Sequence, residues 1–282
     1  MLGPIAWLAF AAGLQMLGAL LFFKAPVDLI LISTGALITF GVYMLNRFTD
    51  EEDGYNYPEQ KMFFQNKSVL IALPIALIAF SILLLAITER LVPWHIVLIV
   101  FGILYSLSII PFVRNKSLCF IRLKDILFVK NIAVSLLWGI TPFALAASQK
   151  NVVMPGKADL LIAVTAFCLT TFITAIAYDV PDAEGDKHAG ISTITTRFGK
   201  KFTRNFLFMV GILGCLFVGT LYVIGKIEIP ALVLFFANVF WTGLVTVPVF
   251  IGRKQPLKLI IKPLLDSQCV FCGISLIIFS LL

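Results

Sequence analysis

The chain has 282 residues, of which 60% are hydrophobic and only 13% are charged, whereas a soluble domain is typically about 45–50% apolar and about 25% charged. This composition excludes an ordinary soluble domain. The net charge of +7 does not indicate nucleic-acid binding, because the basic residues fall in short loops between apolar segments, where they report membrane topology.

Apolar segments of roughly 20 residues, the length that a bilayer core requires, recur from one end of the chain to the other. The short alternating pattern of a membrane β-barrel is absent, so the spans are predicted to be helices. We therefore predict an all-α, polytopic membrane protein with about nine transmembrane helices, and we expect residues 1–282 to form a single transmembrane domain. The predicted spans are 4–23, 27–46, 68–88, 94–113, 126–147, 159–178, 203–224, 230–251 and 266–282.

Lys and Arg are distributed unevenly between the two sides of this predicted bundle. Seventeen of the 22 lie near the ends of spans two, four, six and eight, and five lie on the opposite side. Because cytoplasmic loops are enriched in Lys and Arg, we expect a multi-pass protein whose N-terminus is cytoplasmic and whose C-terminus is outside. Two acidic clusters follow spans two and six, so both are expected to be cytoplasmic.

The first acidic cluster continues a polar stripe on span two. Tyr43, Asn46, Arg47 and Asp50 recur at three- and four-residue steps and therefore share one helical face. A polar stripe on a membrane helix faces protein or water rather than lipid. Asn46 and Asp50 can offer an amide oxygen and a carboxylate to the same ion, and Asp53 extends the cluster.

The second acidic cluster follows span six, where Tyr178 is followed by Asp179, Asp182 and Asp186. These carboxylates share a face if the helix continues past Tyr178, although Pro181 leaves the helical phase open. Like charges this crowded repel each other strongly unless a cation is bound, which favours a metal site over general acid–base catalysis. Oxygen ligands of this kind are typical of Mg²⁺.

Two lysines have two open interpretations each, and the other polar residues considered have a structural interpretation. Lys124 and Lys130, near the start of span five, are either diphosphate ligands or positive anchors at the membrane surface. Asp266 opens the last predicted span and is interpreted as a helix cap. The pair Cys269-x-x-Cys272 lies inside an apolar span and is interpreted as packing.

These motifs resemble those of the UbiA superfamily of intramembrane prenyltransferases. The resemblance covers essentially the whole chain, and its second motif is the specific one. The motifs are Asn46-x-x-x-Asp50, then Asp179-Val-Pro-Asp182-Ala-Glu184-Gly185-Asp186-Lys187, and, in the middle of the chain, Tyr105-Ser106 with Arg122-Leu-Lys124.

The resemblance implies a helical fold around a central cavity that opens sideways to lipid. It also implies an enzyme that binds a prenyl diphosphate through Mg²⁺ and transfers the prenyl group to a hydrophobic acceptor, usually an aromatic ring. Members often have Asp where this chain has Arg47, which makes Arg47 a further candidate for diphosphate contact. The implied catalytic residues are Asp50, Asp182 and Asp186; the metal ligands Asn46, Asp50, Asp53, Asp179, Asp182 and Asp186; the diphosphate ligands Arg47, Lys124, Lys130 and Lys187; and the cavity residues Tyr43 and Tyr178.

Three functions are compatible with the sequence. The first is Mg²⁺-dependent prenyl transfer to a lipid-soluble acceptor such as a quinone precursor, a tetrapyrrole or a glycerol ether. The second is a membrane terpene cyclase that ionises a prenyl diphosphate without an acceptor. The third is a cation transporter. The position of the acidic residues argues against it, because they cluster at one membrane face rather than in mid-membrane. The lipid bilayer, a prenyl diphosphate and a hydrophobic acceptor are the expected partners, and the sequence indicates no protein partner.

Overall fold

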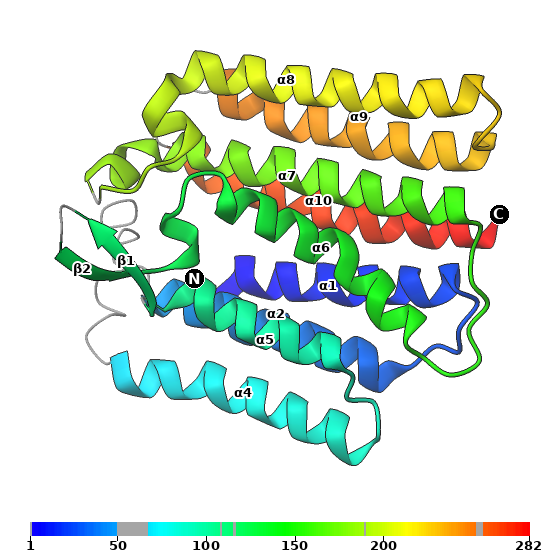
Figure 1. Cartoon of the computed structure of the whole chain (residues 1–282), viewed down its shortest axis with the longest axis horizontal. Coiled ribbons are helices and arrows are strands. Elements are labelled where there is room, and N and C mark those ends of the chain that lie inside the picture. Colours follow the sequence, from blue (N-terminus) through cyan, green and yellow to red (C-terminus); the bar gives the residue numbers. More distant parts are fainter. Residues whose placement is uncertain (1, 50–66, 108, 115–116, 189, 252–255) are drawn as a thin grey trace.

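The protein is described here by a computed structural model that covers all residues except 1, 50–66, 108, 115–116, 189 and 252–255. In the described part, nine α-helices run roughly side by side in one bundle, and a two-stranded hairpin lies at one end of it (Figure 1). The helices are α1 (Leu2–Phe22), α2 (Leu29–Thr49), α4 (Lys67–Ile87), α5 (Pro93–Ser106), α6 (Val129–Ala147), α7 (Lys157–His188), α8 (Ile194–Val223), α9 (Ile229–Ile251) and α10 (Pro256–Leu281); the strands are β1 (Ile110–Arg114) and β2 (Ser117–Ile121), followed by the short 3₁₀ helix η2 (Leu123–Asp125).

Seven of the helices in the described part are long and apolar enough to cross a membrane. The apolar parts of the other two, Ile71–Ile87 and Pro93–Ser106, are shorter. Large apolar side chains such as Leu83, Phe208 and Phe240 are exposed on the outside of the bundle, which is how a surface that faces lipid differs from one that faces water. The prediction of an all-α, polytopic membrane protein is confirmed.

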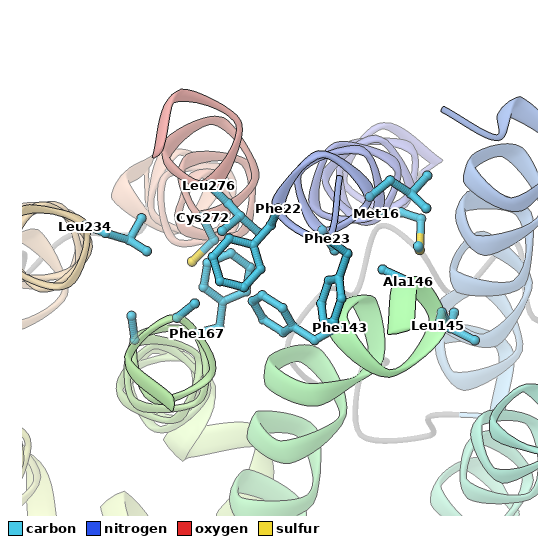
Figure 2. Packing of buried hydrophobic residues seen from close by; sticks show 14 of the residues in the cluster. Met16, Phe22, Phe23, Phe143, Leu145, Ala146, Phe167, Leu234, Cys272 and Leu276 are labelled. Carbon is cyan, nitrogen blue, oxygen red and sulfur yellow. The ribbon is translucent and has the colours of Figure 1, made fainter. Parts of the chain in front are cut away.

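A large cluster of buried apolar side chains lies in the half of the bundle away from the hairpin, where aromatic rings from α1, α6 and α7 meet beside Cys272 and Leu276 of α10 (Figure 2). The rings of Phe22 and Phe143 lie 5.9 Å apart edge to face, and those of Phe143 and Phe167 lie 5.3 Å apart. Such pairs add stability beyond the area that they bury. This core joins α1, α6, α7 and α10.

The first and last helices of the chain pack closely along each other. A Cβ atom on Gly273 of α10 would lie 2.8 Å from Leu14 Cβ and 2.9 Å from Gln15 N of α1, so only glycine fits at this position. Gln15 Nε2 also donates a hydrogen bond to Cys269 O at 2.9 Å. Small residues that let backbones approach, joined by polar contacts, are a common way to hold helices together in a membrane.

The predicted fourth span, 94–113, is wrong in its second half. α5 ends at Ser106, and β1 pairs antiparallel with β2, Pro111 opposite Phe120. Proline has no amide hydrogen for an interior helix position, and it biases the preceding residue, here Ile110, toward extended backbone. The apolar character of this segment therefore continues after its helix has ended.

Two predicted helix starts are also wrong. α8 begins at Ile194 rather than at 203, capped by Thr193, whose Oγ1 accepts a hydrogen bond from Thr196 N at 3.2 Å. Gly199 (φ 83°, ψ 161°) interrupts α8 near its start, a conformation that glycine adopts without steric cost. α10 begins at Pro256 rather than at 266. In both cases a helix begins in a basic, polar segment that hydropathy alone assigns to a loop.

Candidate functional site

A polar cavity of about 240 Å³ is lined by residues of α1, α2, α5, α6, α7 and α10. The ends of α1, α2 and α7 that contribute to it are the ends nearer the hairpin (Figure 1). We call this cavity the polar chamber. Its polar and charged lining comes from helices that are far apart in the sequence. The lining includes Tyr43, Asn46, Arg47, Tyr105, Lys130, Asn131, Thr171, Thr174, Tyr178, Asp179, Asp182, Lys262 and Asp266.

The α7 wall of the chamber is one continuous helical face. α7 does not end near residue 178 as predicted but continues to His188, with Pro181 inside it. Lys187 and His188 stand in the last turn, where positive charge favours the helix C-terminus. Because the helix persists, Tyr178, Asp179 and Asp182 all line the chamber, together with hydroxyl residues from the preceding turns.

The first carboxylate of this face is held by a lysine from α6. Lys130 Nζ lies 2.6 Å from Asp179 Oδ1, and the side chain of Asp179 is only 4% exposed. Its second oxygen, Asp179 Oδ2, is buried and accepts no hydrogen bond. A buried carboxylate oxygen without a partner is costly, so this atom has the capacity to accept one more cation or donor.

The second carboxylate is paired with a residue that the sequence analysis did not consider for the site. Lys262 Nζ of α10 lies 2.9 Å from Asp182 Oδ2. Tyr178 bridges the same two helices, because its hydroxyl donates to Lys262 O at 3.0 Å and is also hydrogen-bonded to Asp266 Oδ1.

The interpretation of Asp266 as a helix cap is wrong. Asp266 is only 4% exposed and lies well inside α10, where it lines the polar chamber. The sequence did contain a signal: Lys262 and Asp266 are four residues apart and therefore share a face of an otherwise apolar helix. That signal was missed because the start of α10 was placed too late.

The α2 wall carries the residues predicted from the first motif. Asn46 and Arg47 both line the polar chamber, and Asn46 Oδ1 accepts a hydrogen bond from Lys124 Nζ at 3.3 Å. Lys124 is 7% exposed, so it is buried against the site rather than extended into a membrane surface. One turn earlier, Tyr43 OH accepts a hydrogen bond from Trp138 Nε1 at 2.9 Å.

Five predicted residues are not placed in the chamber, and Lys124, which contacts Asn46 but is not part of the lining, is one of them. Asp186 is buried at the next turn of α7 but does not line the cavity, and Lys187 is exposed. Asp50 and Asp53 lie outside the described residues. Among the residues that the structure describes, no three His, Cys, Asp or Glu side chains converge around a metal position. The metal site built from both motifs therefore stays a prediction.

A second, apolar cavity of about 170 Å³ adjoins the first between α1, α2, α5 and α6. We call it the apolar chamber. Trp138 and Tyr43, with ring centroids 6.3 Å apart, lie at the boundary because both line both cavities. The shared residues are Tyr43, Asn46, Tyr105, Val134 and Trp138; the other walls of the apolar chamber include Met16, Ile38, Val42, Leu98, Phe101, Leu137 and Leu145.

The chemistry of the two chambers is complementary. Cationic side chains in the polar chamber suit an anionic group, and carboxylate and amide oxygens beside them suit a hard divalent cation. The apolar chamber next to them suits hydrocarbon. A bundle of membrane-spanning helices with a charged chamber joined to an apolar one is the arrangement expected of an integral membrane protein that acts on amphiphilic anions.

The sequence matches the model of the UbiA prenyltransferase family over residues 2–256. Because this match covers most of the 282 residues, the chain belongs to that family. No curated protein sequence is significantly similar to it.

Several solved structures have the same fold. A UbiA homologue from Archaeoglobus fulgidus, bound to DMAPP and Mg²⁺, superposes with a TM-score of 0.64 at 17% identity and covers 98% of this chain and 97% of its own. A UbiA homologue from Aeropyrum pernix K1 in its apo form gives a TM-score of 0.57 at 15% identity over 96% and 97%. A structure of digeranylgeranylglyceryl phosphate synthase gives 0.56 at 16% identity over 98% and 97%. At these identities the likeness concerns the fold.

Proposed function

We propose that the protein transfers a prenyl group from a prenyl diphosphate to a lipid-soluble acceptor, usually an aromatic ring, within the membrane. The observation that carries this proposal is the junction of the polar and apolar chambers at Asn46, Tyr43 and Trp138. The anionic end of a prenyl diphosphate fits the polar chamber, and its reacting carbon would then lie at this junction, within reach of an acceptor in the apolar chamber. The fold neighbour that binds DMAPP and Mg²⁺ and another bound to GPP and Mg²⁺ support the same substrate class.

The residues of the polar chamber fit a divalent cation. Asp179 Oδ2 is a buried carboxylate oxygen that accepts no hydrogen bond, and Asp182 and Asn46 add oxygen donors to the same cavity. Oxygen ligands completed by water and phosphate are what Mg²⁺ prefers. Asp50, Asp53 and Asp186 complete the proposed ligand set. When bound, Mg²⁺ would supply positive charge that neutralises the diphosphate and makes it a better leaving group.

The chain's own cations would hold the diphosphate. Arg47, Lys130 and Lys262 face the polar chamber from three helices, and Lys124 stands behind Asn46. In this proposal their positive charge stabilises the negative charge that develops as the allylic C–O bond breaks and its electron pair leaves with the diphosphate. Exposed Lys187 would reach a diphosphate only at the outer edge of the site.

Aromatic residues would then protect the prenyl cation. Tyr43, Trp138 and Tyr178 line the polar chamber, and the negative faces of aromatic rings attract a cation. Exclusion of water by these side chains favours attack by the acceptor over hydrolysis. The acceptor carbon forms the new C–C bond, and the proton that it carried is released to a base or to water.

We also propose that the hairpin end of the bundle faces the cytoplasm. The N-terminal end of α1 lies at the hairpin end and the C-terminus at the opposite end (Figure 1). The loops at the hairpin end carry most of the Lys and Arg residues, as cytoplasmic loops do.

The test uses the purified protein in nanodiscs with Mg²⁺, a panel of prenyl diphosphates and a panel of aromatic acceptors. The measured quantity is diphosphate release together with the organic product. Asp182→Ala is expected to lower the rate at least about 100-fold, the usual scale for one preorganised charged group. The control is Glu184→Ala on the same helix, where the side chain is exposed, and its rate is expected to equal that of the wild type.

Any of four results would contradict the proposal. Mg²⁺-independent turnover, or full activity of Asp182→Ala, would exclude the proposed site. A cyclised hydrocarbon formed rapidly from prenyl diphosphate alone would make the protein a terpene cyclase instead. Metal flux into proteoliposomes without diphosphate turnover would favour the transporter alternative.

A further inference from the structure

One polar atom that lines the apolar chamber is buried without a hydrogen-bond partner, and the proposed reaction has no use for it. His95 lines this chamber from the first turn of α5 and is 0% exposed. Its Nε2 atom is buried and has no hydrogen-bond partner. A buried polar atom without a partner costs the protein the full desolvation free energy of that atom. A polar ligand atom is therefore favoured at this position.

The hydrogen bond at the other ring nitrogen shows whether Nε2 is a donor or an acceptor, and hence which kind of ligand atom would complement it. Val92 N donates a hydrogen bond to His95 Nδ1 at 3.2 Å, so Nδ1 acts as an acceptor and carries no proton. In a neutral imidazole the proton is then on Nε2. The unpartnered atom is therefore an N–H donor, and its complement is a hydrogen-bond-accepting oxygen such as a carbonyl, hydroxyl or ether.

The position of His95 places that oxygen far from the charged residues. The apolar chamber runs along α5 from Tyr105, which it shares with the polar chamber, to His95. These residues are separated by about 15 Å at a rise of 1.5 Å per residue. Along α2 the chamber likewise extends from Asn46 back to Gly35. Near His95, Thr141 also lines the chamber, and its Oγ1 accepts a hydrogen bond from Trp94 Nε1 at 3.2 Å.

We infer that the apolar chamber binds the acceptor substrate rather than the prenyl chain, and that His95 Nε2 donates a hydrogen bond to an oxygen at the end of the acceptor remote from its reacting atom. This inference rests on the proposed function, because that function requires an acceptor substrate. The oxygen on the acceptor is inferred from the unpartnered donor of His95. A prenyl chain is pure hydrocarbon and would leave the donor unpaired. An oxygenated, largely apolar molecule satisfies both the walls and the donor.

A matched pair of ligands isolates the oxygen. The probes are 2-acetylnaphthalene and 2-ethylnaphthalene, which have similar shape and differ in one carbonyl group. Binding is measured by the rise in thermal unfolding temperature with ligand concentration, since a ligand that binds only the folded state stabilises it by mass action. Each ligand is compared between variants in the same nanodiscs, so that its partition into lipid cancels.

Two substitutions test the roles of the two ring nitrogens separately. His95→Asn keeps an acceptor at the position of Nδ1, where it can receive Val92 N–H, and removes the donor that reaches the chamber. His95→Gln keeps a donor at about the reach of Nε2. We expect His95→Asn to weaken the binding of 2-acetylnaphthalene roughly tenfold, as loss of one buried hydrogen bond does. His95→Gln should stay within about threefold of wild type, and 2-ethylnaphthalene should bind all three proteins equally.

Three outcomes would overturn the inference. They are equal binding of the ketone to wild type and His95→Asn, a parallel loss of both ligands in His95→Asn, and no binding of either ligand to the wild type. Asp182→Ala separates this inference from the proposed function. It should abolish diphosphate release and leave ketone binding unchanged, so a failure of turnover in the wild type with His95-dependent ketone binding would refute the proposed function alone.

Discussion

The ion pair between Lys130 and Asp179 provides the sharpest test of how the polar chamber is built. Lys130→Met keeps most of the volume of the side chain and removes its charge. Asp179 is then left as a buried carboxylate, with its side chain 4% exposed and with one oxygen that already accepts no hydrogen bond. Removal of one partner of a buried pair costs about 3–5 kcal/mol because the other charge stays uncompensated.

The cavity reduces that cost. Lys130 is 22% exposed, so water that enters the chamber partly solvates the remaining carboxylate. We therefore expect about 3 kcal/mol, the lower end of the range for buried pairs. At about 2–4 °C per kcal/mol for a protein of this size, the unfolding temperature of Lys130→Met should fall by roughly 6–12 °C.

A second variant tests the cause. Lys130→Met combined with Asp179→Leu removes both charges, and replacing a buried pair by apolar side chains is often neutral or stabilising. The double variant should therefore unfold within about 1 kcal/mol of wild type while remaining inactive, since both residues line the polar chamber. Thermal unfolding in detergent measures both effects, with Lys187→Met, at an exposed position, as the control.

The reasoning would be refuted by either of two results. One is a Lys130→Met variant as stable as Lys187→Met, which would mean that Asp179 needs no partner. The other is a double variant as unstable as the single one, which would mean that Lys130 stabilises the protein through its packing rather than through its charge.

Two further predictions concern the other end of the bundle and the contact of α1 with α10. Burial alone would raise the pKa of Asp28, but its hydrogen bond and ion pair with Arg90, together with hydrogen bonds donated by Leu31 N and Ile30 N, outweigh burial and hold the pKa below 3.8. A depressed pKa stabilises the fold above the unfolded value and loses that effect as the pH falls through the folded value. Asp28→Asn, which keeps a helix cap for α2, should be less stable by about 1 kcal/mol at pH 7, and this difference should shrink as the pH falls below 3.8 and Asp28 becomes protonated in the folded protein. A constant difference across denaturation curves at several pH values would contradict this. Gly273→Ala should cost roughly 1–3 kcal/mol by overpacking, because its Cβ would meet Gln15 N at 2.9 Å, whereas Gly219→Ala, with nothing within 4 Å, should be neutral or stabilising by about 0.5–1 kcal/mol.

Much of the site was predictable because its residues follow one another on single helices. The three- and four-residue spacing of Tyr43, Asn46 and Arg47 predicted one face of α2, and these residues do line the polar chamber. The same spacing predicted that Tyr178, Asp179 and Asp182 share a face if the helix continued, and α7 does continue. Helical periodicity is a local property, so the sequence carries it directly.

The sequence was less informative where a helix begins or ends at a different residue from its apolar segment. α7, α8 and α10 extend into polar segments, and apolar Ile110–Arg114 forms a strand. Hydropathy reports where a segment prefers to lie, whereas backbone conformation also depends on caps, prolines and hydrogen bonds. The misplaced start of α10 concealed Asp266 and Lys262 as site residues.

The sequence by itself determined that this is a helical membrane protein with acidic and basic residues at the ends of its spans, and it provided the motifs of the UbiA family. Only the tertiary structure decided which side chains meet. Lys262 pairs with Asp182, Lys130 with Asp179, and His95 faces an apolar chamber. These pairs join different helices, and which helices lie side by side is set by the packing of small and large side chains over the whole bundle, which no local pattern records.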